Sequence, residues 1–314
     1  MKSFFIENTG REEGRDEIVS VGEFSKQCNL KILYGDENSE IRFSTISVNR
    51  PGLFITGYEE YFASSRVQVM GNAEVNYLYG LAAEERIRIL RKLFSKGIPC
   101  LILSRGIKPM KELPGLAAEY NVPVFLSLEI TSEVINNLVV YLNKLLAPSI
   151  SLHSVFVNIN GIGVALIGDS GIGKSETALE LLHRGHRLIS DDAVVIKRIG
   201  NELIGYSPEV TNGFMEIRGV GIIDVRQVFG IGAVQSHRSI DLIIELEHWQ
   251  QGKHYDRVGK EMQYMEILDI KVPKIVIPVS AGRNLAIVIE VAAGNFNLRK
   301  SGYIAAETIE KRLK

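Results

Sequence analysis

Cysteine is scarce in this chain: only Cys28 and Cys100 occur among its 314 residues. Two thiols are too few for the disulfide framework that stabilises small secreted proteins, and their separation matches no metal-binding motif. We therefore interpret both as reduced residues that pack in the protein interior. This interpretation predicts a cytoplasmic protein.

The chain also lacks an excess of charge of either sign and any long apolar run. Its 36 basic and 37 acidic side chains leave a net charge of −1 at pH 7. Nonspecific binding to nucleic acids or membranes depends on a basic surface, so the sequence predicts neither partner. No run of 18 apolar residues occurs, and residues 1–15 are charged rather than apolar. We therefore expect neither a transmembrane helix nor a signal peptide.

The remaining composition, 46% hydrophobic and 23% charged, is typical of a globular protein, and the length favours two domains. In the first half, short apolar runs alternate with segments of helical period. This alternation predicts an α/β sandwich. The expected strands are residues 30–34, 52–56, 66–70, 100–103 and 122–126, and the expected helices are residues 82–95, 113–120 and 132–146.

The second half is rich in expected strands, at residues 155–159, 163–167, 186–190, 194–199, 202–205, 241–246, 274–278 and 285–290. The pair Gly200 and Asn201 between two of these runs indicates a hairpin, so we expect antiparallel pairing. A final helix is expected over 298–313, and segment 146–153 is interpreted as a linker. The predicted domains are an amino-terminal α/β domain, residues 1–133, and a carboxy-terminal phosphate-binding-loop (P-loop) domain, residues 134–314.

One motif, G-x-x-x-x-G-K-[ST], indicates a P-loop. Its glycines let backbone N–H groups converge on a phosphate, the lysine adds a cation, and the serine hydroxyl is a hard ligand for Mg²⁺. A glycine-rich turn without a ligand is the alternative, but an apolar strand precedes the motif and a segment of helical period follows it. The order of elements therefore favours a nucleotide site, formed by Gly168, Asp169, Ser170, Gly171, Ile172, Gly173, Lys174 and Ser175.

Two adjacent carboxylates, Asp191 and Asp192, follow the apolar run 187–190. Phosphoryl transfer needs a group that accepts the proton of the attacking hydroxyl, and it needs ligands for a metal ion. Carboxylates at a strand end beside a P-loop are candidates for both roles. An ordinary β-turn is the alternative, because Asp is a common turn residue.

Further charged residues are candidates for the same chemistry. Glu216, Arg218 and Asp224 lie within an apolar, glycine-rich stretch, so they either bind metal and phosphate or form a structural salt bridge. Arg257, on a polar loop, is either a group that neutralises transition-state charge or a solvated surface residue. His153 precedes a strand expected to pair beside the P-loop strand, and it is either an active-site imidazole or a structural linker residue.

Five segments, taken in order, resemble the HPr kinase/phosphorylase family: residues 152–153, 168–181, 184–192, 216–225 and 279–294. They extend through the second half, and the first half has the length and α/β pattern of the family's amino-terminal domain. The family's kinase domain is similar to that of phosphoenolpyruvate carboxykinases, with the P-loop in a largely antiparallel environment. The chain has neither the H-R-D nor the D-F-G motif of eukaryotic protein kinases, in agreement with this resemblance.

The resemblance implies a bifunctional enzyme. As a kinase it phosphorylates a regulatory serine of the phosphocarrier protein HPr, with ATP or pyrophosphate as donor. As a phosphorylase it transfers that phosphate to inorganic phosphate and releases pyrophosphate. The resemblance also implies a hexamer that acts in carbon catabolite repression.

The resemblance further implies roles for individual residues. Asp192 is the base during phosphorylation and the acid in the reverse direction, with Asp191 as the next candidate. His153, Lys174 and Arg257 complete the active site, while Ser175 and Glu216 bind Mg²⁺. The stretch implied to serve both reactions is Met215, Glu216, Ile217, Arg218, Gly219, Val220, Gly221, Ile222, Ile223 and Asp224. The stretch implied to serve chiefly dephosphorylation is Pro278, Val279, Ser280, Ala281, Gly282 and Arg283.

Two other function classes share a P-loop. One is a small-molecule kinase or a carboxykinase-like metabolic enzyme with a small acceptor. The other is a regulator whose assembly is controlled by ATP, without phosphorylation of a protein. The additional charges around Glu216 and Arg257 favour catalysis, because a nucleotide switch has less need of a second set of convergent charges.

Overall fold

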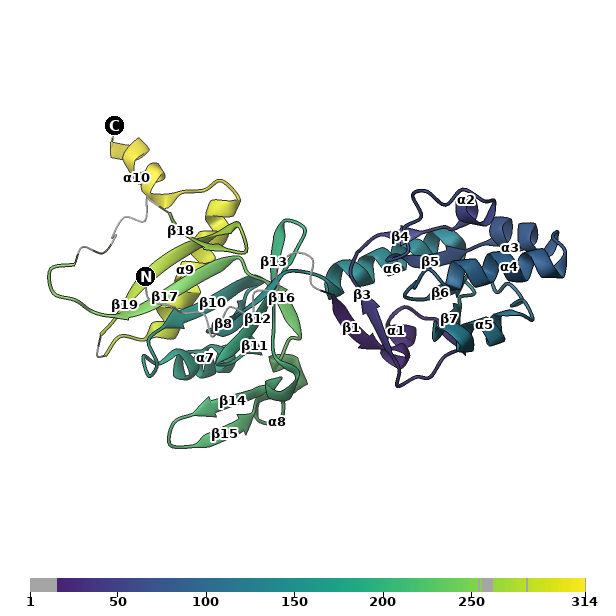
Figure 1. Cartoon of the computed structure of the whole chain (residues 1–314). Coiled ribbons are helices and arrows are strands. Elements are labelled where there is room, and N and C mark those ends of the chain that lie inside the picture. The colour runs from purple at the N-terminus through teal and green to yellow at the C-terminus, as the bar shows by residue number, and fades with distance from the viewer. Residues whose placement is uncertain (1–15, 254, 256–261, 281, 314) are drawn as a thin grey trace. The chain divides into compact units, whose positions relative to one another are not determined.

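The computed structural model describes residues 16–253, 255, 262–280 and 282–313 (Figure 1). The described residues form two compact units, 16–147 and 148–313. Both units combine helices with sheets. The prediction of a mixed α/β protein with two domains is therefore confirmed.

The boundary between the units lies between Ala147 and Pro148, whereas the predicted boundary followed residue 133. Helix α6 (Thr131–Leu145) accounts for the difference. Its buried residues, among them Leu138 and Leu142, belong to a core cluster of the amino-terminal unit. The complete helix is therefore part of that unit.

The amino-terminal unit is built around a five-stranded sheet of order β2-β7-β6-β5-β4. Strands β4, β5, β6 and β7 run parallel to one another, whereas the edge strand β2 pairs antiparallel with β7. Helices cover both faces, because alternate strand residues enter two separate core clusters. The elements are β1 (Glu17–Ser20), α1 (Val21–Gln27), β2 (Lys31–Tyr34), β3 (Glu40–Phe43), β4 (Val48–Asn49), α2 (Gly52–Ile55), β5 (Val67–Met70), α3 (Asn72–Tyr79), α4 (Ala83–Phe94), β6 (Leu101–Leu103), α5 (Leu113–Tyr120), β7 (Val124–Leu126) and α6.

The strand predicted over residues 52–56 is wrong, because this segment forms the short helix α2. Phe54 and Ile55 are buried while Leu53 is 70% exposed. Such a brief apolar run fits either a strand or a buried helical turn, and its period alone does not distinguish the two. Packing of the two buried side chains on the parallel sheet decides the outcome.

The carboxy-terminal unit contains most of the strands. Its elements are β8 (Ser149–His153), β9 (Val155–Ile159), β10 (Ile162–Gly168), α7 (Lys174–His183), β11 (Arg187–Ser190), β12 (Ala193–Ile199), β13 (Glu202–Tyr206), η1 (Glu209–Thr211), β14 (Phe214–Ile217), β15 (Gly221–Asp224), α8 (Val225–Phe229), η2 (Ile231–Ala233), β16 (His237–Ser239), β17 (Leu242–His248), β18 (Gln263–Ile267), β19 (Ile270–Val279), α9 (Leu285–Lys300) and α10 (Ala305–Leu313).

These elements form three layers (Figure 1). The central layer is a six-stranded sheet of order β11-β9-β10-β17-β19-β18. On β10, Val164 and Leu166 pack against helices α7 and α9, while Ala165 and Ile167 pack against a four-stranded sheet of order β16-β13-β12-β8. The P-loop strand is thus buried on both faces, which fixes the position of the loop that follows it.

Strand pairing around β10 differs between its two sides. Strand β9 pairs antiparallel with β10, as predicted, and β12 and β13 form the hairpin expected at Gly200 and Asn201. On the other side β17 and β19 run parallel to β10. The carboxyl ends of these three parallel strands therefore meet at one edge of the sheet.

Two further predictions of local structure are wrong. Residues 285–290, predicted as a strand, begin helix α9, because the Asn284 side chain accepts a hydrogen bond from the Ile287 N–H and caps the helix. The single helix predicted over 298–313 is divided into the end of α9 and the separate helix α10. Gly302, with φ of +89°, lies at the break.

The segment 146–153, predicted as a linker, contains strand β8. This strand pairs antiparallel with β12, with His153 opposite Ala193. Pro148 lies just before the strand and marks the unit boundary. His153 is therefore held in a sheet as the last residue of β8, opposite the first residue of β12.

Within the described residues, none of the helices has both the length and the apolar character needed to cross a bilayer.

Candidate active site

The P-loop connects β10 to α7 as the motif predicts. Gly168 adopts φ of +150°, and a Cβ there would lie 2.5 Å from the carbonyl oxygen of Leu246 on β17. Gly173 adopts φ of +98° at the amino-terminal cap of α7. Only glycine fits both positions without strain. The backbone N–H groups at the start of α7 are thus available to an anion.

Lys174 is 6% exposed, although it carries a charge. Its Nζ donates hydrogen bonds to the carbonyl oxygens of Gly168 at 2.9 Å and Asp169 at 3.3 Å. Burial lowers the pKa of Lys174, and the nearby carboxylates, with Asp192 first among them, act in the opposite direction. The side chain is folded over the loop and its charge is directed to the phosphate site.

Asp191 is buried, and both of its carboxylate oxygens accept hydrogen bonds. Ser175 Oγ donates to Oδ1 at 2.9 Å, and the backbone N–H of Glu216 donates to Oδ2 at 3.1 Å. Burial raises the pKa of Asp191, while these two donors lower it. Asp191 therefore joins the start of α7 to strand β14, and its oxygens are occupied in doing so.

Asp192 differs from its neighbour in exposure, in its side-chain partner and in its backbone conformation. Its side chain is 76% exposed, and its Oδ1 lies 3.0 Å from Nδ1 of His153. Its backbone is left-handed, with φ of +66°, and its carbonyl oxygen accepts a hydrogen bond from the Ser154 N–H. A left-handed non-glycine residue costs about 1 kcal/mol. The conformation turns Asp191 into the protein and Asp192 toward solvent.

The hairpin of β14 and β15 contributes the remaining charges. Buried and exposed side chains alternate along strand β14, with Met215 and Ile217 in the core and Glu216 exposed. Arg218 follows the strand and lies over the P-loop, since a Cβ at Gly171 would be 2.8 Å from its Nη1. The hairpin therefore places one carboxylate and one guanidinium beside the loop.

These residues surround one cavity of about 240 Å³. It is lined by His153, Ser170, Gly171, Gly173, Lys174, Ser175, Glu176, Asp191, Asp192, Glu216 and Arg218. The structure thus brings together residues from four separate segments of the sequence. Cations and backbone N–H groups suit phosphate oxygens, and the exposed carboxylate suits proton transfer. The arrangement is fit for phosphoryl transfer.

A metal ion bound by protein side chains alone is not supported. Among the described residues, no group of three His, Cys, Asp or Glu side chains is placed to hold one. Mg²⁺ differs from zinc in this respect, because it usually takes only one or two carboxylates and completes its shell with water and substrate phosphates. The hard oxygens of Ser175 and Glu216 border the cavity and match that preference.

Some predicted site residues lie away from the cavity. Ile172 is buried in the core. Asp224 caps helix α8 by accepting hydrogen bonds from Arg226 N–H and Gln227 N–H, a structural role. The turn between β14 and β15 is exposed, with Val220 72% accessible. The remaining members, Gly219, Gly221, Ile222 and Ile223, form this turn and strand β15.

The stretch Pro278 to Arg283 lies at the end of β19 and leads into α9. Pro278, Ser280 and Arg283 line a second cavity, not the one at the P-loop. Ala281 and Arg257 lie outside the described residues, so their predicted roles stay predictions.

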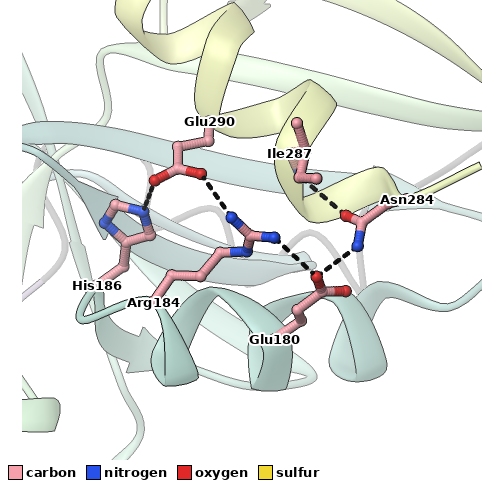
Figure 2. A network of polar contacts seen from close by, with 6 residues as sticks. All are labelled: Glu180, Arg184, His186, Asn284, Ile287 and Glu290. Carbon is pink, nitrogen blue, oxygen red and sulfur yellow. Dashed lines mark hydrogen bonds and ion pairs between the residues drawn. The ribbon is translucent and has the colours of Figure 1, made fainter.

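Helix α9 is joined to the P-loop helix α7 by a polar network (Figure 2). Arg184 bonds Glu180 at 3.2 Å and Glu290 at 3.3 Å, and His186 Nε2 lies 3.0 Å from Glu290. Asn284, which caps α9, donates to Glu180 at 2.5 Å. Helix α9 is therefore held in a fixed relation to the P-loop helix.

Two features were missed by sequence reasoning. Glu176 lines the cavity, and its position directly after the motif was the available signal. The second cavity was also missed, although the single tryptophan of the chain, Trp249, marks it.

Two family models together match most of this chain. A model of the HPr Serine kinase C-terminal domain matches residues 144–313, and one of the HPr Serine kinase N terminus matches residues 19–142. The HPr kinase/phosphorylase of Peptoclostridium acidaminophilum is 46% identical over 95% of this chain and 97% of its own. That of Caldanaerobacter subterraneus subsp. tengcongensis is 46% identical over 95% and 98%.

A solved structure is also similar, that of the Hpr(Ser) kinase/phosphatase from Coxiella burnetii. It is 38% identical, covers 51% of this chain and 97% of its own, and has a TM-score of 0.47.

Proposed function

Because the chain belongs to the HPr kinase/phosphorylase family of enzymes, we propose that it phosphorylates the regulatory serine of HPr with ATP or pyrophosphate. We propose that the same site reverses the reaction by transferring the phosphate to inorganic phosphate, which releases pyrophosphate. One observation carries the proposal: an exposed carboxylate, Asp192, and a buried lysine, Lys174, line the same cavity at the P-loop. Proton acceptor and phosphate-binding cation are thus adjacent.

Asp192 is the residue that moves the proton. During phosphorylation its carboxylate accepts the proton of the serine hydroxyl as the serine oxygen bonds to phosphorus and the bond to the leaving phosphate breaks. In reverse, phosphate attacks and the protonated Asp192 returns a proton to the departing serine oxygen. Its 76% exposed side chain is accessible to a residue on another protein, and His153 holds it in place.

Lys174, Arg218 and the loop N–H groups bind the phosphate oxygens. Charge on these oxygens changes during transfer, and donors already in position stabilise it without reorganisation. The cavity wall is made of charged, polar and glycine residues. Its contacts are therefore directed at phosphate, which supports pyrophosphate as an alternative donor.

Ser175 and Glu216 are the residues that would hold Mg²⁺, and when bound the ion would neutralise phosphate charge. Asp191 positions both of them, through the Ser175 hydroxyl and the Glu216 N–H. This arrangement makes Asp191 a positioning residue rather than the base.

Replacing Asp191 by Asn is expected to raise the Mg²⁺ concentration for half-maximal activity about 10–100-fold, the usual cost of losing a group that orients metal ligands. The amide nitrogen of Asn is a donor, and it would face another donor, either Ser175 Oγ or the Glu216 N–H. One of the two hydrogen bonds that Asp191 accepts would therefore be lost. The measurement is transfer rate against Mg²⁺ concentration. Asp241→Asn is the matched control, because Asp241 also accepts a backbone N–H, from Gly163 at 2.9 Å, yet lies outside the cavity. An unchanged Mg²⁺ requirement in Asp191→Asn contradicts the positioning role.

The resemblance supports further parts of the proposal. Arg257 would neutralise charge in the transition state, and Pro278 to Arg283 would act chiefly in dephosphorylation. The carboxy-terminal unit, residues 148–313, would be the catalytic domain and share its architecture with phosphoenolpyruvate carboxykinases. The enzyme would act in the cytoplasm as a hexamer, in carbon catabolite repression.

The test is incubation of the purified chain with Mg²⁺, HPr and ATP labelled at the terminal phosphate. We expect label on one serine of HPr, and none on HPr in which that serine is replaced by alanine. Hydrolysis of ATP or assembly of the chain, without label on HPr, would instead support a small-molecule kinase or an ATP-controlled assembly.

A further inference from the structure

The cavity at the P-loop has no place for a nucleotide base. It measures about 240 Å³, and none of its lining residues is aliphatic or, His153 aside, aromatic. Bases are bound by stacking and by apolar surface with a few polar groups. A nucleotide whose phosphates occupy the P-loop must therefore place its base elsewhere.

A second cavity lies at the same edge of the six-stranded sheet. Strands β10, β17 and β19 are adjacent and parallel, so the residues after each strand meet at this edge. The P-loop follows β10, Trp249 follows β17, and Arg283 follows β19. The backbone N–H of Trp249 donates a hydrogen bond to the Val279 carbonyl oxygen at 3.2 Å. Trp249 and Arg283 both line the second cavity, which measures about 680 Å³.

The lining of this cavity contrasts with that of the first. Ile277 of β19 and Val288 of α9 give apolar walls, Trp249 gives an aromatic ring, and Asn295 gives an amide. Trp249 is 57% exposed. A large aromatic surface beside a polar group that can both donate and accept hydrogen bonds is the chemistry that recognises a base.

The strand that pairs with the P-loop strand leads to the second cavity. Gly168, the first residue of the P-loop, pairs with Leu246, and Trp249 lies three residues further along the chain, about 10 Å in an extended strand. The opposite side of the loop is occupied by His153, Asp192 and Glu216, where the acceptor must enter. The second cavity lies on the side of β17 and β19, and this is where we place the rest of the donor.

We propose that this second cavity binds the base and ribose of the nucleotide donor, with Trp249 stacked on the base and Asn295 at its polar edge. The inference rests on the proposed function and specifies which cavities each of the two donors occupies. ATP occupies both cavities, whereas pyrophosphate occupies the P-loop cavity alone. Arg283, which also lines the second cavity, would contact the ribose or the innermost phosphate.

The test compares the two donors in Trp249→Ala. We expect KM for ATP to rise about tenfold, the lower part of the range for loss of a stacked base, while KM for pyrophosphate is unchanged. Tyr264→Ala is the matched control, because Tyr264 on β18 is also 57% exposed and does not line the cavity. A second variant, Ala292→Trp, fills the cavity from helix α9 and is expected to give the same selective loss.

Calorimetric titration of ADP and of pyrophosphate into the same variants measures the loss of affinity for each ligand without HPr. The pocket is therefore tested even where the wild-type chain fails to label HPr, an outcome that would overturn the proposed function alone. Equal weakening of both ligands, or no weakening of either in both variants, would overturn the assignment of the base to this cavity.

Discussion

Replacing Asp192 by Asn is expected to lower kcat for phosphorylation of HPr by about 10²–10⁴-fold, the usual contribution of a general base. The same loss is expected for phosphorolysis, because the reverse step needs the same group in its protonated form. Asparagine keeps the size of the side chain, tolerates the left-handed backbone, and still has an oxygen facing His153. The substitution removes the negative charge and the ability to exchange a proton, while the size of the side chain is kept.

The measurement is single-turnover transfer in both directions at saturating donor. Asp269→Asn is the matched control, since Asp269 is also left-handed, with φ of +61°, and its side chain is 85% exposed. Asp269 pairs with Arg198 away from the cavity, so its variant is expected to react at the wild-type rate. Wild-type phosphorylation by Asp192→Asn would show that Asp192 is not the base.

Replacing Lys174 by Met is expected to lower kcat/KM about 10²–10³-fold with either ATP or pyrophosphate, as for loss of one preorganised donor. Methionine has a similar length and is compatible with burial, so the loop is expected to keep its structure. What disappears is the cation whose Nζ lies at the Gly168 carbonyl oxygen. The loss is expected with both donors because both present phosphates to this group.

Steady-state rates with each donor give the comparison. Lys271→Met, a change at an exposed residue of β19, controls for removal of a lysine. A Lys174→Met enzyme that keeps its activity with pyrophosphate would contradict the placement of Lys174 at the transferred phosphate.

The P-loop was predictable from the sequence because its geometry is local. Gly168 and Gly173 are required by backbone angles that only glycine adopts freely, and the lysine and serine follow at fixed spacing. The strand before the loop and the helix after it were equally clear, since each is a single run of one period. A binding site formed by one continuous segment can therefore be predicted from the sequence.

The pairing of His153 with Asp192 depended on structure that is not local. The two residues come together because β8 pairs with β12 in a register that places His153 opposite Ala193. The sequence suggested that segment 146–153 was a linker, so this register was not available. The distinction between Asp191 and Asp192 is of the same kind, because it comes from burial and a left-handed turn rather than from residue type.

The two segments that were predicted as strands but form helices share one cause. Residues 52–56 and 285–290 are short apolar runs that suit a strand or a buried helix equally. The cap at Asn284 and the packing of α9 on the sheet decide the second case. The cavity beside Trp249 could not be predicted for a related reason: its walls come from strand β19 and from helix α9, which the sequence had assigned as a strand.

We expect one site to carry out phosphoryl transfer in both directions, and the reverse reaction gives the sharpest test of this. Phosphorylated HPr is mixed with the enzyme, Mg²⁺ and ³²P-labelled inorganic phosphate, and labelled pyrophosphate is measured against HPr dephosphorylated. We predict that one labelled pyrophosphate forms for each phosphate removed, and that Asp192→Asn forms it about 10²–10⁴-fold more slowly. Release of unlabelled phosphate with no pyrophosphate would mean that water is the acceptor, and it would contradict the account.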